Sequence, residues 1–166
     1  MRFGAKKGGK IIKEASDGTA TLEFPDGSKY KGNLKNNMAD GQGTMEFSDG
    51  RQLSGSFEKG KPHGKELILT FPDGRKYLGD YTNGKRHGYG KMFFPDGKKY
   101  EGEWKNDLPH GEGKMTHPDG TVEDGTWARG KVIDPSAEKE ARGNLFRTIA
   151  ILAALAAGLV LLLFYW

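Results

Sequence analysis

The fold is decided by residues 73–97, DGRKYLGDYTNGKRHGYGKMFFPDG, because most of the chain repeats the pattern of this stretch. Two Asp-Gly pairs enclose a short alternating segment, a polar turn, a His-Gly step and a second alternating segment. One glycine of the stretch recurs at spacings of 23, 23, 24, 23 and 23 residues, as Gly9, Gly32, Gly55, Gly79, Gly102 and Gly125. A fixed period of this length predicts a repeat architecture.

Each repeat has the pattern of two short strands. Tyr77, Gly79 and Tyr81 occupy every second position, which is the period of a half-buried strand. A helix would have to hold several glycines, each costing up to about 1 kcal/mol. Asn83-Gly84 and the Pro-Asp-Gly runs supply the backbone angles that tight turns need. The sequence therefore predicts a mainly β fold, an elongated single-layer antiparallel sheet of stacked β-hairpins with about eleven strands.

One face of the predicted sheet carries the aromatic residues and glycines, with each ring lying over a glycine of a neighbouring strand. The other face is mostly Lys, Glu, Asp, Ser and Thr, so we expect it to be solvated. The third repeat has one extra residue between Gly64 and Phe71, which predicts a β-bulge. The expected repeat core consists of Tyr30, Gly32, Phe57, Tyr77, Gly79, Tyr81, Tyr100, Gly102, Trp104 and Trp127.

The amino-acid composition narrows the range of possible functions. The chain has 166 residues, no cysteine and a net charge of +4, with 26 basic and 22 acidic residues interspersed. The absence of cysteine excludes disulfides and thiolate metal sites. Interspersed charge argues against a nucleic-acid-binding tail. The first 16 residues contain no apolar run, so no secretory signal peptide is predicted there.

The recurring polar residues are typical of turns rather than of catalytic or metal-binding sites. His63, His87 and His110 share one repeat position, which Asp17 and Asp40 fill in earlier repeats, as expected of a turn residue that caps backbone groups. The repeat keeps these histidines a full hairpin apart, which argues against a metal site. Each recurrent aspartate precedes a glycine in a turn, and acid-base catalysis needs two carboxylates in one pocket. We therefore expect no catalytic residues, no metal and no cofactor.

The motifs resemble a known family. Tyr100 to Trp104 (YEGEW), followed by HGEG and a closing Asp-Gly at a period of 23 residues, is similar to the MORN repeat (membrane occupation and recognition nexus). The resemblance covers roughly residues 4–130 and departs from the pattern at Lys7, Leu53 and Glu123. It implies a non-catalytic scaffold or adaptor, because MORN proteins as a family serve in such roles, often near membranes.

The composition changes after Gly130. We expect a MORN-repeat array over residues 1–133, a polar and partly helical linker over 134–144, and a transmembrane helix over 145–166. The uncharged run from Ile149 to Trp166 would span about 27 Å as a helix, close to the thickness of a bilayer core. Flanking basic residues predict that the N-terminal domain lies on the cytoplasmic side, or its organellar equivalent, of a single-pass membrane protein.

Small residues on the predicted tail helix and basic residues in the turns suggest two contact surfaces. Ala150, Ala154 and Gly158 recur every four residues and are predicted to pack against another helix, a copy of itself or a partner subunit. Basic residues could alternatively contact anionic lipid headgroups or only keep the sheet edge solvated. The candidates for headgroup contact are Lys85, Arg86, Lys105, Arg142 and Arg147.

Two functional hypotheses remain open at the level of sequence. The first is a membrane-anchored scaffold, adaptor or accessory subunit that binds a protein partner, with a homodimer as one form of it. The second is a module that recognises anionic phospholipid and holds the domain against the bilayer. Both predict a membrane protein that is not an enzyme.

Overall fold

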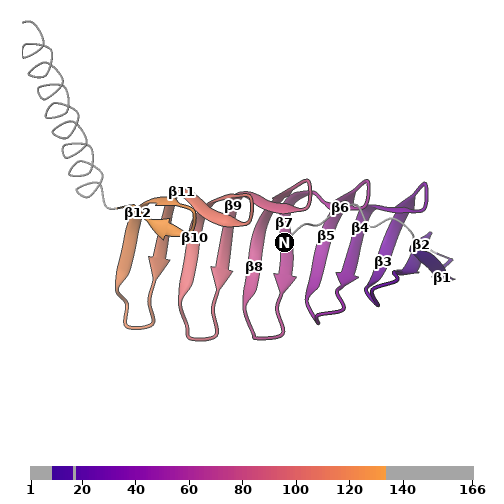
Figure 1. Ribbon diagram of the computed structural model, residues 1–166, viewed down its shortest axis with the longest axis horizontal. Helices are drawn as coiled ribbons and strands as arrows, with labels where there is room; N and C mark the ends of the chain where they lie inside the picture. Colours follow the sequence, from indigo (N-terminus) through magenta and orange to yellow (C-terminus); the bar gives the residue numbers. More distant parts are fainter. Residues whose placement is uncertain (1–8, 17, 134–166) are drawn as a thin grey trace, which may run out of the picture. The chain divides into compact units, whose positions relative to one another are not determined.

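The computed structural model describes residues 9–16 and 18–133, which form one antiparallel sheet (Figure 1). This described part contains thirteen strands. They are β1 (Lys10–Glu14), β2 (Thr19–Glu23), β3 (Lys29–Lys35), β4 (Met38–Glu46), β5 (Gln52–Glu58), β6 (Lys61–Pro62), β7 (Gly64–Thr70), β8 (Lys76–Thr82), β9 (Lys85–Phe93), β10 (Lys99–Lys105), β11 (Leu108–Thr116), β12 (Val122–Ala128) and β13 (Lys131–Val132).

The strands follow one another through the sheet in chain order. Each pairs with its neighbour in sequence, except that the two-residue β6 pairs with β5 and leaves β5 to pair with β7 (Figure 1). The predicted single sheet of stacked hairpins is confirmed. The strand count exceeds the expected eleven because β6 and β13, each only two residues long, lie at hairpin tips.

Two kinds of turn alternate along the sheet. At the hairpin tips both central residues have positive φ, for example Asn83 at 52° and Gly84 at 83°. Type I′ turns require this geometry, and asparagine and glycine adopt it at little cost. At the opposite ends of the strands, Asp-Gly turns join one repeat to the next, and the aspartate accepts a hydrogen bond from the backbone two residues on, as Asp73 does from Arg75 (3.1 Å).

The core is built from tyrosines lying over glycines. Tyr77 is fully buried, and a Cβ added to Gly79 would come 2.5 Å from the Tyr77 hydroxyl oxygen and 2.5 Å from the Gly90 Cα. The hydroxyl passes over the glycines to donate to the backbone carbonyl of Asp80 (3.1 Å). Tyr30 and Tyr100 repeat this arrangement with Asn33 and Glu103.

A second aromatic position joins one repeat to the next. The Trp104 ring meets the Tyr77 ring of the preceding repeat edge to face, with centroids 5.0 Å apart, and its Nε1 donates to the Gly90 carbonyl (3.1 Å). Trp127 and Tyr100 form the same pair in the next repeat, also at 5.0 Å. Because each ring contacts the preceding hairpin, the repeats stabilise one another rather than a single central core.

The third repeat fills its core differently. Leu53 stands where the second, fourth and fifth repeats have tyrosine, and Leu67 stands where they have glycine, and both are fully buried. The Leu67 side chain covers Gly55, as a tyrosine ring does elsewhere. The predicted bulge is confirmed: the register of β7 against β8 shifts between Gly64 and Leu67, and Glu66 has a φ of 57°. Tyr81, at the position of Trp104, meets the Tyr77 ring of its own repeat edge to face, with centroids 5.6 Å apart.

The predicted linker and tail lie beyond Ile133. The unit formed by the sheet ends at Val132, and the predicted linker and transmembrane helix lie outside the described residues. Within the part of the chain that the structure describes, no helix is long and apolar enough to cross a membrane.

Candidate binding groove

Backbone hydrogen bonds connect successive hairpin tips. The second turn residue of each tip donates to a carbonyl of the preceding tip: Gly60 to Ala39 and Gly84 to Pro62 (both 2.8 Å), Asp107 to Arg86 (3.1 Å), and Gly130 to Pro109 (3.0 Å). Bulges between the body of each hairpin and its tip, such as the shift between Gly79 and Tyr81, change the course of the strands below the tips. The tips therefore form a continuous rim.

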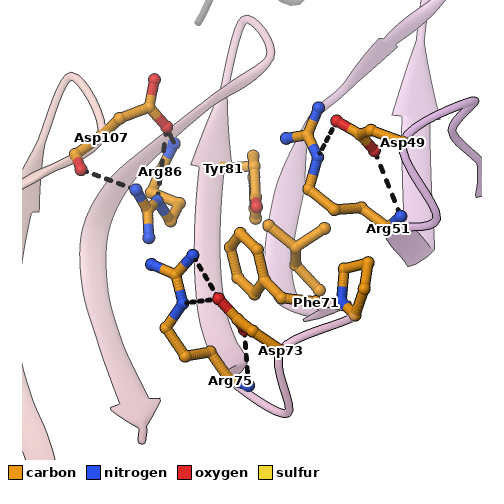
Figure 2. A pocket seen from close by; sticks show the side chains of 10 residues that line it. Asp49, Arg51, Phe71, Asp73, Arg75, Tyr81, Arg86 and Asp107 are labelled. Atoms are coloured by element: carbon orange, nitrogen blue, oxygen red, sulfur yellow. Dashed lines mark hydrogen bonds and ion pairs between the residues drawn. The ribbon is translucent and has the colours of Figure 1, made fainter.

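A groove of about 450 Å³ lies between this rim and the Asp-Gly turns of the third and fourth repeats (Figure 2). Its apolar floor consists of Leu69, Phe71, Pro72 and Tyr81. Charged residues from both ends of the strands surround the floor: Asp49, Arg51, Asp73, Arg75, Arg86 and Asp107.

One side of the groove is formed by two copies of the same turn. Arg75 donates from Nε to the Asp73 carboxylate (2.8 Å), and its guanidinium carbon lies 4.5 Å from the centre of the Phe71 ring. In the preceding repeat Arg51 binds Asp49 at 2.8 Å and lies over Phe47. Stacking and ion pairing together fix the direction of both guanidinium groups.

The other side is formed by Arg86, which joins two hairpin tips. Its Nη2 donates to the Asp107 carbonyl (2.8 Å) and its Nε to the Asp107 carboxylate (3.4 Å). The guanidinium lies 4.5 Å from the Trp104 ring centre and 5.4 Å from that of Tyr77. The Arg86 side chain is only 17% exposed. Figure 2 shows Arg86 and Arg75 approaching the floor from opposite sides, with Tyr81 beside them.

Comparison between repeats shows that this arginine is local to the groove. The position of Arg86 is occupied by Ser16 in the first repeat and by apolar residues in the others, namely Ala39, Pro62, Pro109 and Val132. The position of Arg51 and Arg75 holds Ser28, Lys98 and Thr121 elsewhere. A repeat-by-repeat alignment could have located the groove, since three arginines occur in the third and fourth repeats where other repeats have different residues.

The surroundings of Tyr81 and Asp73 in the groove shift the pKa values of both side chains. Burial raises the pKa of Tyr81 above its ordinary value, against the opposing effect of the Arg86 charge. The Arg75 backbone N–H, assisted by its side chain, lowers the pKa of Asp73, which therefore stays ionised near neutral pH. The groove presents ring faces, apolar surface and fixed charges of both signs.

The other candidate residues are distributed over the sheet. Lys85 and Lys105 lie at the hairpin tips, where Lys85 donates to Asn106 (3.5 Å) and Lys105 is exposed. The described members of the expected repeat core lie on the glycine and aromatic face. Arg142, Arg147, Ala150, Ala154 and Gly158 lie outside the described residues. Over residues 9–16 and 18–133, no cluster of three or more His, Asp or Glu side chains is placed to hold a metal ion.

The fold and the groove define a hairpin-repeat protein with a charged and aromatic groove on one face of an open sheet. The family model of the MORN repeat matches residues 30–50, 54–65, 77–99 and 100–122, and the chain therefore contains four MORN repeats. The shortest match falls in the third repeat, which carries Leu53 and the bulge. MORN repeats indicate a scaffold for protein or lipid interaction.

Comparison with curated proteins finds no match. Among solved structures, the chain is similar to the TCP domain of SAS-4 (dCPAP) of Drosophila melanogaster, solved in complex with a proline-rich motif of Ana2 (dSTIL). The two are 14% identical with a TM-score of 0.36, over 72% of this chain and 90% of that chain. A likeness of this size carries no information on what the present chain binds.

Proposed function

We propose that this protein is a non-catalytic adaptor whose groove in the third and fourth repeats binds an extended segment of a partner protein. Residues 145–166 anchor it in a membrane as a single-pass tail, with the repeat array on the cytoplasmic or organellar-equivalent side. In this arrangement the array presents its groove to a partner protein or partner subunit at the membrane surface. The proposal rests on one observation, the enclosure of an apolar floor by three oriented arginines.

The geometry of the groove defines what such a segment must offer. Leu69, Phe71 and Tyr81 provide a surface for one or two apolar side chains. Arg75 uses Nε and Nη2 towards Asp73, and a guanidinium carries five N–H donors, so it can also donate to a backbone carbonyl or carboxylate of the ligand. Because the strands around the groove already pair with one another, recognition depends on side chains rather than on an added strand.

The test uses the full chain in lipid nanodiscs and a displayed library of random 12-residue peptides, followed by fluorescence anisotropy with the enriched peptides. Arg86→Pro removes the groove arginine and introduces the residue that the same position holds as Pro62 and Pro109. We expect it to weaken binding about tenfold or more.

The matched control is Lys98→Ala. Lys98 occupies the position of Arg75 in the next repeat and pairs with Asp96 in the same way (3.0 Å), but does not line the groove. We expect Arg75→Ala to weaken binding and Lys98→Ala to leave it unchanged. Equal effects of the two substitutions, or peptides that bind Arg86→Pro as well as the wild type, would place the binding surface elsewhere.

A second candidate is recognition of anionic lipid, favoured by the exposed basic residues at the tips. Lys105 is exposed, and Lys59 has an exposed side chain next to Glu58. Each basic residue near an anionic leaflet contributes about 1 kcal/mol. Arg86 is not available in the same way, because its guanidinium is bonded to Asp107 and covers Trp104.

Liposome flotation distinguishes the two candidates. The full chain is reconstituted in neutral nanodiscs and mixed with separate anionic vesicles at low and at high salt. Salt-sensitive binding to the vesicles that is lost in Lys85→Ala/Lys105→Ala, but kept in Arg86→Pro, supports lipid recognition. Peptide binding that is lost in Arg86→Pro, without binding to the vesicles, supports the adaptor.

A further inference from the structure

The face of the sheet opposite the aromatic core, here called the back face, is not uniformly polar. Ile68, Leu78, Tyr89 and Phe93 lie on it, on the adjacent strands β7, β8 and β9. Ile68, Tyr89 and Phe93 are 36%, 52% and 40% exposed. The back face is mostly polar, as expected, but these four apolar residues depart from that pattern in this part of the sheet.

The four side chains form one patch. Ile68 is directly opposite Leu78 in the register of β7 and β8. Leu78 is opposite Lys91, so Tyr89 and Phe93 are its diagonal neighbours on β9. Diagonal neighbours across a strand pair lie about 7–8 Å apart, within reach of aromatic side chains. The patch is therefore continuous across three strands.

Other repeats have polar residues at the same positions. The position of Phe93 holds Glu23, Glu46, Thr70 and Thr116, and the position of Leu78 holds Lys31, Ser54, Glu101 and Asp124. The repeat fold therefore does not require apolar residues there. Their concentration at the third and fourth repeats needs another explanation, and exposed apolar clusters commonly mark interaction sites.

Charges are ordered on either side of the patch. Lys76 and Lys99 lie on the side of the Asp-Gly turns, and Asp80 and Glu103 lie on the side of the hairpin tips. Between the two rows, Glu101 binds Lys91 at 2.7 Å and Lys99 at 3.0 Å. The patch thus lies between a row of two lysines, Lys76 and Lys99, and a row of two carboxylates, Asp80 and Glu103, beyond which Lys105 lies at the tip end of β10.

We propose that the back face of β7 to β10 is a homodimer interface, in which two copies pack face to face about a two-fold axis that runs across the strands. Such an axis reverses the strand direction, so Lys76 of each copy faces Asp80 of the other and Lys99 faces Glu103. The Leu78 side chains meet each other at the axis, and Phe93 meets Tyr89. A two-fold axis along the strands would instead bring the two basic rows together.

A second copy matches the surface better than other occupants do. An isologous interface is self-complementary, and a patch between rows of opposite charge satisfies this condition. Antiparallel sheets pack face to face in this aligned way through their apolar residues. An anionic bilayer would repel Asp80 and Glu103, and the uncharged run of residues 149–166 would leave both charged rows unmatched.

The first test measures the association of the full chain in detergent micelles by sedimentation velocity and native mass spectrometry. We expect a dimer at micromolar concentrations, weakened about tenfold or more by Phe93→Asp. Thr116→Asp alters the same position of the next repeat and should leave the dimer intact. A wild-type chain that stays monomeric to about 100 µM, or a dimer that is equally stable in Phe93→Asp, overturns the proposal.

A charge swap tests the orientation of the two copies. Lys76→Glu and Asp80→Lys should each weaken the dimer, and the double variant should restore it, because each new charge again faces its opposite. Failure of the double variant to recover association contradicts the two-fold axis across the strands.

Cysteine labelling identifies what covers the patch on the back face. The chain has no cysteine, so Leu78→Cys provides a single thiol at the proposed axis. A water-soluble maleimide should label it readily in dilute protein and about tenfold more slowly at concentrations where the dimer forms. Protection at every concentration would mean that the chain's own tail or the detergent and lipid cover the patch, which overturns the proposal.

Discussion

At the scale of single residues, the fold depends on pairing a large side chain on one strand with a glycine on the neighbouring strand. A tyrosine on one strand occupies the space that a Cβ would need on Gly79 or Gly90, and its hydroxyl reaches a backbone carbonyl beyond them. In the third repeat, where Leu53 replaces the tyrosine, Leu67 replaces the glycine. The two substitutions compensate each other, so the sheet continues through this repeat.

The first prediction concerns this pairing. Gly79→Ala should lower the free energy of unfolding by about 1–3 kcal/mol, because the new Cβ would meet backbone at Gly90 and the Tyr77 hydroxyl. Gly9→Ala is the matched control, since the three atoms nearest its Cβ would all belong to the Phe24 side chain, which can move. Urea unfolding of the two variants measures the difference. Equal loss of stability would argue against tyrosine-on-glycine packing as the source of the core's stability.

The second prediction concerns Glu101 on the back face. Hydrogen bonds from Lys91 and Lys99 lower the pKa of Glu101 from 4.5 to about 2. Since the folded pKa lies below the unfolded one, the contribution of Glu101 to stability is complete above pH 4.5 and is lost as the pH falls towards 2. Carbon-13 NMR of the carboxyl group should give a midpoint near 2, and Glu101→Gln should reduce the loss of stability over this interval. A midpoint near 4.5 would contradict the ion-pair geometry.

At the scale of elements, the hairpin was predictable from one repeat alone, whereas the contacts that form the groove were not. The alternation of Tyr77, Gly79 and Tyr81, with Asn83-Gly84 after them, is sufficient to predict two strands and a turn, because these are local properties of the chain. The groove depends on contacts between Arg86 and Asp107, which lie in successive hairpins. The sequence identified Arg86 as a basic residue at a hairpin tip. Its burial over Trp104 depends on the hydrogen bonds that join successive tips.

The tip turns supply a third prediction. Lys59 occupies the first central position of its turn with a φ of 49°, where Asn36, Asn83 and Asn106 stand in other repeats. Asparagine tolerates this left-handed conformation better than lysine does. Lys59→Asn should therefore raise the free energy of unfolding by about 0.5 kcal/mol. Lys61→Asn, just beyond the turn, should give no such gain, and identical effects of the two variants would contradict the turn assignment.

At the scale of the whole array, stability is distributed along the sheet rather than concentrated at one centre. Each hairpin contacts its two neighbours, and β1 and β12 lie near the ends of the strand order. Repeat proteins of this kind gain stability from each neighbour interface, so the outermost repeats have less of it. This gradient follows from the period of the sequence alone.

Hydrogen exchange tests this distribution as the fourth prediction. Amide protection measured by mass spectrometry should be highest in β8, β9 and β10 and should decrease towards β1 and β13. Uniform protection from end to end would indicate a single cooperative core and would contradict the description of the sheet as an array.

Site-specific photocrosslinking reports whether the groove beside Phe71 contacts a partner protein. Benzoylphenylalanine replaces Phe71 in one full-length chain and Phe94, the same position in the next repeat, in another. Both are irradiated in native membranes, and crosslinked proteins are identified by mass spectrometry. We expect a protein adduct at position 71 that disappears when Arg86→Pro is added, and no such adduct at position 94. Equal capture at both positions, or an adduct at position 71 that persists without Arg86, would contradict the proposed role of the groove.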